Sequence, residues 1–227
     1  MRLRVGLTVF GLVVANTACT GGSLGSPSPI LDMDQAVGRA RSDNPFPATS
    51  LVVFQWRVRE PDLRLEGQGV ARFQHPDRAR LDLFMENGEA VLAAGLVEDE
   101  LWARDEQALE FVPSPALLWA FLGVFRPGRD ATRLDGEFFD DDVFRLRYRL
   151  PEGDELRYLF RSGRVTEVEL RHEGDAVHRV VLKQESGGEL PSEATYRNLA
   201  SFSELKLTVD TVERVDSHPS DIWYLVP

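Results

Sequence analysis

The chain has only one cysteine among its 227 residues, and that residue, Cys19, lies near the N-terminus. A single cysteine cannot form an internal disulfide and cannot supply a set of thiolate metal ligands. Long apolar runs are missing as well. The two most apolar stretches, Val5 to Ala15 and Pro113 to Phe125, are both far shorter than the roughly 20 residues that cross a bilayer as a helix.

Sequence signatures of catalysis are also missing. The one Gly-x-Ser-x-Gly match, residues 21–25, lies in the glycine- and serine-rich stretch after Cys19 and not between a strand and a helix, so it is no nucleophile elbow, and no glycine loop of the kind that cradles phosphate is present. Ser217, His218 and Asp221 are close in sequence, but a triad also requires an oxyanion site, for which no residue pattern is present. The four histidines are scattered without metal-ligand spacing: His75, His172, His178 and His218. We therefore expect no enzymatic activity, no cofactor and no metal.

Positive charge is scarce relative to negative charge, since the formal net charge is −11. Removing residues 1–18 takes away two arginines and no acidic residue, so the net charge of the remainder is −13. This charge argues against a nucleic acid or a bare anionic bilayer surface as the partner. The run Asp140 to Asp142 lacks the ligand spacing of a calcium loop, so we expect a solvated turn there. Arg145, Arg147 and Arg149 share one strand face, where a solvated stripe is favoured over a lipid-headgroup clamp.

The first residues have the pattern of an export signal. Arg2 and Arg4 precede an apolar stretch, and small residues lead to Ala18 and Cys19. This placement of Cys19 resembles the acylated cysteine of bacterial lipoproteins, although Asn16 stands where that family prefers leucine. The alternative is an ordinary exported protein with a chance cysteine. The resemblance implies a signal peptide over residues 1–18 and attachment to the outer membrane, facing the periplasm, because no aspartate follows Cys19.

Residues 19–30 are rich in glycine, serine and proline, so we expect a flexible tether. An amphipathic helix is predicted for residues 31–42. Alternation with period two then predicts about ten or eleven antiparallel strands, including a short one at 109–112 and a last one at 222–226. The 90–97 stretch is apolar on both faces, which is typical of a central strand. No βαβ rhythm is present, so the pattern indicates a mainly β, single-domain barrel or sandwich over residues 31–227.

Pro113 to Phe125 is the one strongly apolar helix signal after the export signal. Ser114 and Pro115 suit the start of a helix, and the residues that follow leave no polar face. Such a helix must be covered on most sides. A plain core helix is one interpretation; the other, which we prefer, is that it closes the open side of a curved sheet and lines an apolar cavity.

The order of these features resembles the periplasmic lipoprotein-carrier superfamily typified by LolA and LolB. The resemblance covers most of residues 31–227, and its most telling part is the ending: Leu190-Pro191, then Leu205, Leu207 and Val209, then the apolar and aromatic residues 222–227. Because of Cys19, the anchored LolB-like branch is the nearer match. The resemblance implies an open, incomplete antiparallel β-barrel of about eleven strands, with helices closing its mouth over a hydrophobic cavity for acyl chains.

From the residues, the candidate cavity lining is apolar and faces inward on the predicted strands and helix. It comprises Val52, Phe54, Trp56, Leu81, Leu83, Val91, Ala93, Leu118, Trp119, Phe121, Leu122 and Phe125. The sequence thus predicts a monomeric, membrane-attached protein that binds lipid or lipoprotein acyl chains during transfer to the outer membrane, with a soluble periplasmic carrier as a candidate partner. The alternative is a non-catalytic scaffold or assembly subunit with the same fold, in which side chains fill the cavity.

Overall fold

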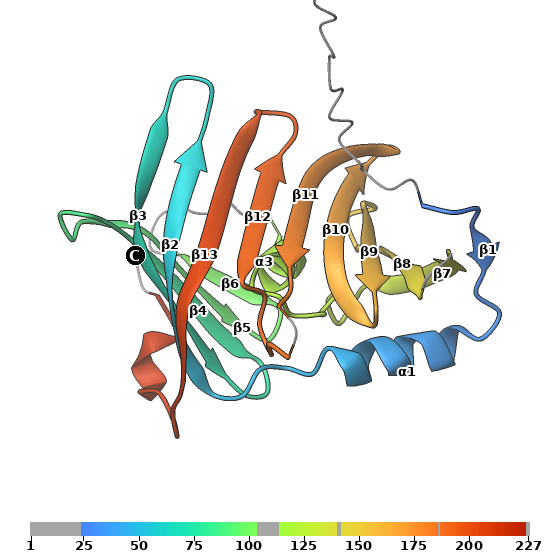
Figure 1. The fold of residues 1–227 in the computed structure, drawn as a ribbon, viewed down its shortest axis with the longest axis horizontal. Helices are drawn as coiled ribbons and strands as arrows, with labels where there is room; N and C mark the ends of the chain where they lie inside the picture. Colours follow the sequence, from blue (N-terminus) through green and yellow to red (C-terminus); the bar gives the residue numbers. More distant parts are fainter. Residues whose placement is uncertain (1–23, 104–113, 140–141, 186, 226–227) are drawn as a thin grey trace, which may run out of the picture.

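The computed structural model describes residues 24–103, 114–139, 142–185 and 187–225. Within these residues, thirteen strands form one antiparallel sheet whose two edge strands, β1 and β6, do not pair. The sheet order is β1-β7-β8-β9-β10-β11-β12-β13-β2-β3-β4-β5-β6. Figure 1 shows the sheet curling round so that β4 to β6 lie behind β12 and β13. The predicted open antiparallel barrel is therefore confirmed.

The strands are connected almost entirely by short turns. Their bounds are β1 (Ser28–Pro29), β2 (Ser50–Arg59), β3 (Arg64–Gln74), β4 (Arg78–Met85), β5 (Ala90–Val97), β6 (Glu100–Ala103), β7 (Thr132–Phe138), β8 (Val143–Arg149), β9 (Glu155–Arg161), β10 (Arg164–His172), β11 (Asp175–Lys183), β12 (Glu193–Asn198) and β13 (Ser203–Arg214).

Two strands were not predicted. β1 lies within the expected tether and pairs with the end of β7, and the following residue, Ile30, is buried. β7 itself escapes the alternation rule because its register with β8 shifts between Arg133 and Gly136. Such a bulge breaks the period of two from which strands are recognised in a sequence. The strand predicted at 109–112 lies outside the described residues.

Two glycines of β3 let atoms of the neighbouring strands β2 and β4 approach the β3 backbone closely. Gly69 lies opposite Phe54 in the β2–β3 register, and a Cβ atom on Gly69 would lie 2.3 Å from the Phe54 ring. At Gly67 an added Cβ would lie 2.1 Å from the carbonyl oxygen of Phe84. No side chain fits at such distances, so the large rings of β2 fold over the glycines of β3.

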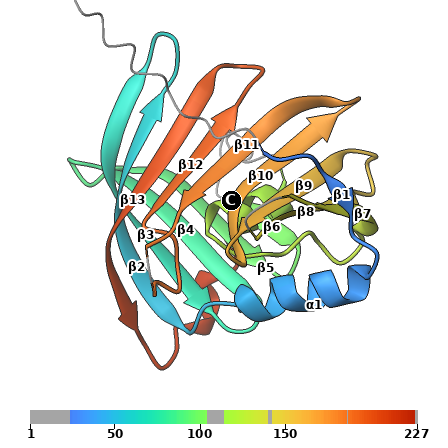
Figure 2. The ribbon, with the colours of Figure 1, turned by 45° about the vertical axis from the view of Figure 1, so that its right-hand side comes forward.

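Helices α1 (Met33–Asp43) and α3 (Pro115–Phe121) have different environments. Figures 1 and 2 show α1 lying across one end of the curled sheet and α3 enclosed inside the curl. The Asp32 carboxylate caps α1 by accepting a hydrogen bond from the Gln35 N–H at 2.9 Å. In the described residues, no helix is both long enough and apolar enough to cross a membrane.

The C-terminal segment packs on the outer face of β4 to β6. The strand predicted at 222–226 is wrong for the described residues, because 220–222 form a 3₁₀ helix and Trp223 follows it, fully buried. The Trp223 carbonyl oxygen would lie 2.5 Å from a Cβ atom on Gly95, so the segment lies close against β5. Buried Asp82 accepts hydrogen bonds from Arg80, whose Nη1 also donates to the Ile222 carbonyl at 2.7 Å.

Candidate functional site

The concave face of the sheet is apolar from one side of the curl to the other. In β2, β3 and β4 the register aligns Phe54 with Gly69 and Leu83, and Val52 with Ala71 and Leu81. The same rows continue through the other strands, because one side of every strand faces inward. The buried members on β8 to β13 are Phe144, Leu146, Tyr148, Leu156, Tyr158, Phe160, Val165, Val168, Leu170, Val180, Leu182, Ala194, Tyr196, Leu205 and Leu207.

Helix α3 fills the middle of this concave face. All of Ala116 to Phe121 is buried, as the absence of a polar side predicted. Trp119 is held on three sides: its Nε1 donates to the Glu98 carbonyl at 2.9 Å, the Phe46 ring lies 5.5 Å away and the Arg126 guanidinium lies 5.4 Å over its ring. The helix ends at Phe121, earlier than the predicted stop at residues 126–128, because Gly123 adopts a positive φ of 83°.

Phe125, beyond the helix, completes the packing with aromatic side chains. Its ring lies 4.9 Å from that of Tyr158 and 5.3 Å from that of Phe160, both in edge-to-face geometry. Phe160 in turn stacks on Phe144 at 4.4 Å. Side chains of the protein itself therefore occupy this half of the interior.

A small apolar cavity remains at the C-terminal end of α3. It has a volume of about 30 Å³, which is room for one or two water molecules but not for an acyl chain. Phe121 and Leu122 form one wall, Leu190 and Pro191 another, and the sheet closes the rest through Val52, Phe54, Ala71, Phe73, Ala194, Leu207 and Val209. The expected open cavity beneath 113–125 is thus nearly filled in this conformation, because α3 occupies the space.

Ten of the twelve candidate residues are buried in the core beside one another: Val52, Phe54, Trp56, Leu81, Leu83, Leu118, Trp119, Phe121, Leu122 and Phe125. The other two lie elsewhere. Ala93 pairs with Asp82, which faces outward, and Val91 occupies a bulge between the Leu83–Leu92 and Phe84–Ala90 pairs with a 38% exposed side chain. β5 is apolar on both sides, so alternation with period two could not show which of its residues face the interior.

The twelve candidate residues named from the sequence do not include one part of the lining of the small cavity. Leu190, Pro191, Ala194 and Leu207 line it opposite Phe121. The alternation of Leu205, Leu207 and Val209 is a signal that could have identified Leu207. The role of Leu190 and Pro191 depends on a loop that folds back against Gly123, where an added Cβ would lie 2.4 Å from Pro191 Cδ. No local pattern predicts that contact.

Polar groups enter the concave face at few places. The Tyr196 hydroxyl lies 3.0 Å from His178 Nδ1, and the two rings stack. Burial raises the pKa of Tyr196 and lowers the pKa of His178, so both groups are neutral at pH 7. The fully buried hydroxyl of Tyr158 has no hydrogen-bond partner within the described residues. The interior is therefore suited to uncharged, apolar groups.

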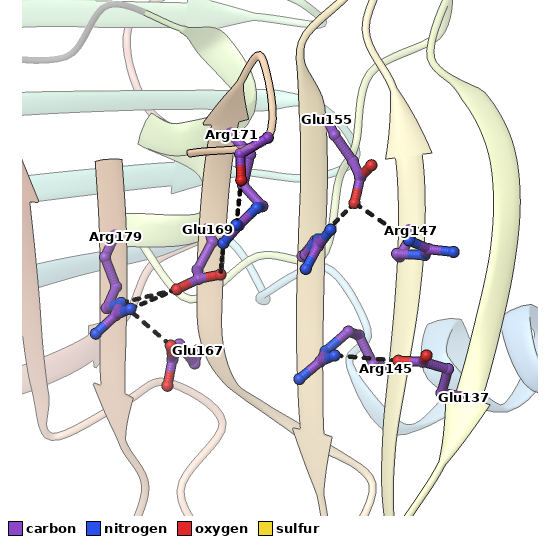
Figure 3. A network of polar contacts seen from close by, with 10 residues as sticks. Glu137, Arg145, Arg147, Glu155, Glu167, Glu169, Arg171 and Arg179 are labelled. Atoms are coloured by element: carbon purple, nitrogen blue, oxygen red, sulfur yellow. Dashed lines mark hydrogen bonds and ion pairs between the residues drawn. The ribbon is translucent and has the colours of Figure 1, made fainter. Parts of the chain in front are cut away.

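The convex face carries ion pairs, drawn in Figure 3. Arg145 contacts Glu137 at 3.0 Å, and Arg147 contacts Glu155 at 3.7 Å. Arg145 and Arg147 of the expected solvated stripe thus form ion pairs with carboxylates on the neighbouring strands β7 and β9. Further along, Glu169 accepts hydrogen bonds from Arg171 and Arg179. Burial acts to raise the pKa of Glu169, but these two arginines outweigh it and the pKa is lowered.

The candidate catalytic groups do not converge. His218 Nε2 lies 3.1 Å from the Ser50 carbonyl oxygen and its ring packs edge-on to Trp223, which is a structural role. Asp142 accepts a hydrogen bond from Arg39 at 2.7 Å. Across the described ranges, no three His, Cys, Asp or Glu side chains are grouped so as to hold a metal ion. Cys19 lies outside the described residues.

Comparison with known proteins identifies the fold. No family model and no curated protein matched the sequence. Among solved structures, a LolA superfamily protein from Nitrosomonas europaea is 15% identical, with a TM-score of 0.57 over 83% of this chain and 96% of that one. A domain from Vibrio parahaemolyticus, described as an outer membrane lipoprotein-sorting protein, is 11% identical, with a TM-score of 0.55 over 83% and 94%. The chain therefore has the fold of LolA superfamily proteins.

Proposed function

We propose that this chain is a periplasmic lipoprotein, held on the outer membrane by acyl groups on Cys19, that binds acyl chains of lipids or lipoproteins on the concave face of its sheet. In this proposal residues 1–18 are the signal peptide, most of 19–30 is the tether and the remainder is the binding domain. The protein is a carrier or receptor without catalytic activity. The lipoprotein-sorting description of the Vibrio parahaemolyticus domain supports this class of function.

The observation that carries the proposal is that a single short helix, α3, covers the centre of the concave face. A continuous apolar surface is shielded at its centre by one helix of seven residues, all apolar from Ala116 to Phe121. A helix this short depends on tertiary packing for its stability. Its N-cap residue, Ser114, makes no side-chain hydrogen bond to the helix.

An acyl chain that takes the place of α3 would keep the apolar side chains of the sheet from water, and the displaced helix, which has no polar face, would pack against the other side of the acyl chain. The helix leaves the space that it fills, and the hydrocarbon covers the same side chains. The cavity beside Phe121 and Ala194 is the place where such a chain would first enter, since it already lies between the helix and the sheet. In this account the packed interior is the empty state of the carrier.

Uptake of a fluorescent fatty acid by the domain, purified with Cys19→Ser, tests the proposal. We expect saturable binding that Ala194→Phe weakens by tenfold or more, because the new ring occupies the entry cavity. Thr195→Phe is the matched control: it adds a phenyl ring at the adjacent position of β12, where Thr195 pairs with Lys206 on the convex face. It should leave binding within twofold.

Circular dichroism and urea unfolding of both variants must show that they are folded. Equal binding by both variants would contradict a site on the concave face, and absence of uptake by the unsubstituted domain would contradict acyl-chain binding altogether.

The scaffold alternative is favoured by one specific observation, the cavity of only about 30 Å³. If side chains fill the interior permanently, the acidic outer surface is the place where partners bind. Stable protein partners recovered from solubilised envelopes, together with no lipid uptake, would favour this alternative.

A further inference from the structure

An exposed apolar patch lies where the chain enters the folded domain. Leu31 is 95% exposed, although its neighbour Ile30 is buried and donates a backbone hydrogen bond to the Gly136 carbonyl at 2.9 Å. Phe138, at the end of β7, is 39% exposed and pairs with Ser28 of β1. These side chains border a surface hollow of about 590 Å³, also lined by Pro29, Ile30, Asp32, Gln35, Ala36 and Arg39.

The Leu31–Phe138 patch is the part of the fold that follows the anchor most directly in the chain. Ser28 is nine residues after Cys19, and nine extended residues span at most about 30 Å. With acyl groups on Cys19 in the bilayer, β1 must lie within that distance of the membrane surface. This step depends on the lipid anchor in the proposed function, but not on acyl-chain binding by the concave face.

The charges around the patch have partners, which lowers the cost of bringing it to a lipid surface. Arg133 contacts the Asp34 carboxylate at 2.8 Å, and Arg39 contacts Asp142 at 2.7 Å. The Asp32 carboxylate accepts the Gln35 N–H. Two apolar side chains are also too little surface for a stable protein interface, which buries more than about 1,000 Å². A bilayer imposes no such minimum, because any apolar group near the headgroups can enter the acyl boundary.

We propose that the Leu31–Phe138 patch rests on the bilayer that holds the Cys19 anchor, and so fixes how the domain faces the membrane. The acyl groups supply the attachment, and the patch supplies the orientation. Residues of the β12–β13 hairpin lie six strands along the sheet from β1, well away from the patch in both views of Figures 1 and 2. Phe202 on that hairpin is 81% exposed and therefore serves as a matched probe position.

The test uses the mature, lipidated protein in vesicles of phosphatidylethanolamine and phosphatidylglycerol. Cys19 is the only cysteine, and acylation blocks its thiol, so Leu31→Cys, Phe138→Cys and Phe202→Cys each introduce one reactive site. Each is labelled with an environment-sensitive fluorophore. Nitroxide-labelled lipid should quench the probe at 31 or 138 at least twofold and leave the probe at 202 within 10% of its starting intensity.

Quenching at neither 31 nor 138, or stronger quenching at 202, would overturn the proposal. Self-quenching that grows with protein density, without quenching by the lipid nitroxide, would also overturn it and indicate a second copy of the chain on the patch. If the protein stayed in solution and did not bind the vesicles, that result would contradict both the lipid anchor and the contact of the patch with the bilayer. Quenching at 31 in a protein that takes up no fatty acid would uphold the patch while ending acyl-chain binding.

Discussion

Asn44 is a buried amide that joins α1 to the sheet. Its Nδ2 donates to the Ala40 carbonyl and to the Gly163 carbonyl, both at 2.8 Å, and its Oδ1 accepts from the Val165 N–H at 3.0 Å. Asn44→Ala removes this partner from the Gly163 carbonyl and the Val165 N–H in the interior, while the Ala40 carbonyl keeps its bond from the backbone N–H of residue 44, so the free energy of unfolding should fall by about 2–4 kcal/mol. Urea unfolding of the domain that carries Cys19→Ser measures this loss.

The control for that substitution is Asn87→Ala. Asn87 accepts one hydrogen bond from the Glu89 N–H on an exposed turn, where water can replace it. We expect a change below about 1 kcal/mol. Equal losses at positions 44 and 87 would contradict the account of Asn44 as the attachment point of α1.

The contribution of Glu193 to the stability of the fold should depend on pH. It lies between Lys183 and Lys206 on the convex face, and hydrogen bonds from these two lysines lower its pKa from 4.5 to about 2. The unfolded chain therefore binds a proton at this site at higher pH than the folded chain does. The stabilising contribution is complete above pH 4.5 and is lost as the pH falls toward 2.

Side-chain carboxyl NMR shifts of Glu193 measure this titration directly, and Glu193→Gln should remove the corresponding part of the acid dependence of stability. A titration midpoint near the ordinary value would contradict the geometry of the lysine pair.

At the scale of elements, the end of α3 is the point where the helix meets the Leu190-Pro191 loop. Gly123 has φ 83°, and an added Cβ would lie 2.4 Å from Pro191 Cδ. Gly88 has nearly the same φ, 85°, with no atom within 4 Å of an added Cβ. Gly88→Ala should cost about 1–2 kcal/mol of unfolding free energy for the left-handed backbone alone. Gly123→Ala should cost about 1–3 kcal/mol more, because the methyl group overlaps Pro191.

Thermal or urea unfolding of the two variants compares these costs, and equal values would show that α3 and the loop separate easily. In that case the loop would not form one wall of the entry cavity in solution.

The sequence predicted strands best where one face of the strand is buried and the other is exposed to solvent. In β2 and β4, alternation placed Phe54, Trp56 and Leu83 correctly on the inner face, because a strand has only two sides. It failed in β5, where the outer face is also covered, by the segment containing Trp223. The bulge at Val91 shifts the register further, and a bulge leaves no trace in a pattern of residue types.

At the scale of the whole molecule, the fold class and the open barrel could be predicted, but the occupancy of the interior could not. Because residues 113–125 are apolar, they must be shielded from water by the rest of the protein. Two arrangements do this: the helix lines an open cavity under the sheet, or the helix fills the space under the sheet. The choice depends on how Trp119 and Phe121 pack against residues far away in sequence, such as Phe46 and Tyr196. Such packing is a property of the assembled core rather than of any segment.

The central claim is that a hydrocarbon chain can take the place of α3 against the concave sheet. The most direct measurement is photo-crosslinking with a fatty acid that carries a diazirine in its chain, followed by mass spectrometry of the labelled peptides. The account predicts labels on concave residues of β2, β3, β12 and β13 around Phe54 and Ala194, reduced by excess unlabelled fatty acid and lost in Ala194→Phe. Labels confined to the convex face, or no labelling of the folded protein, would contradict it.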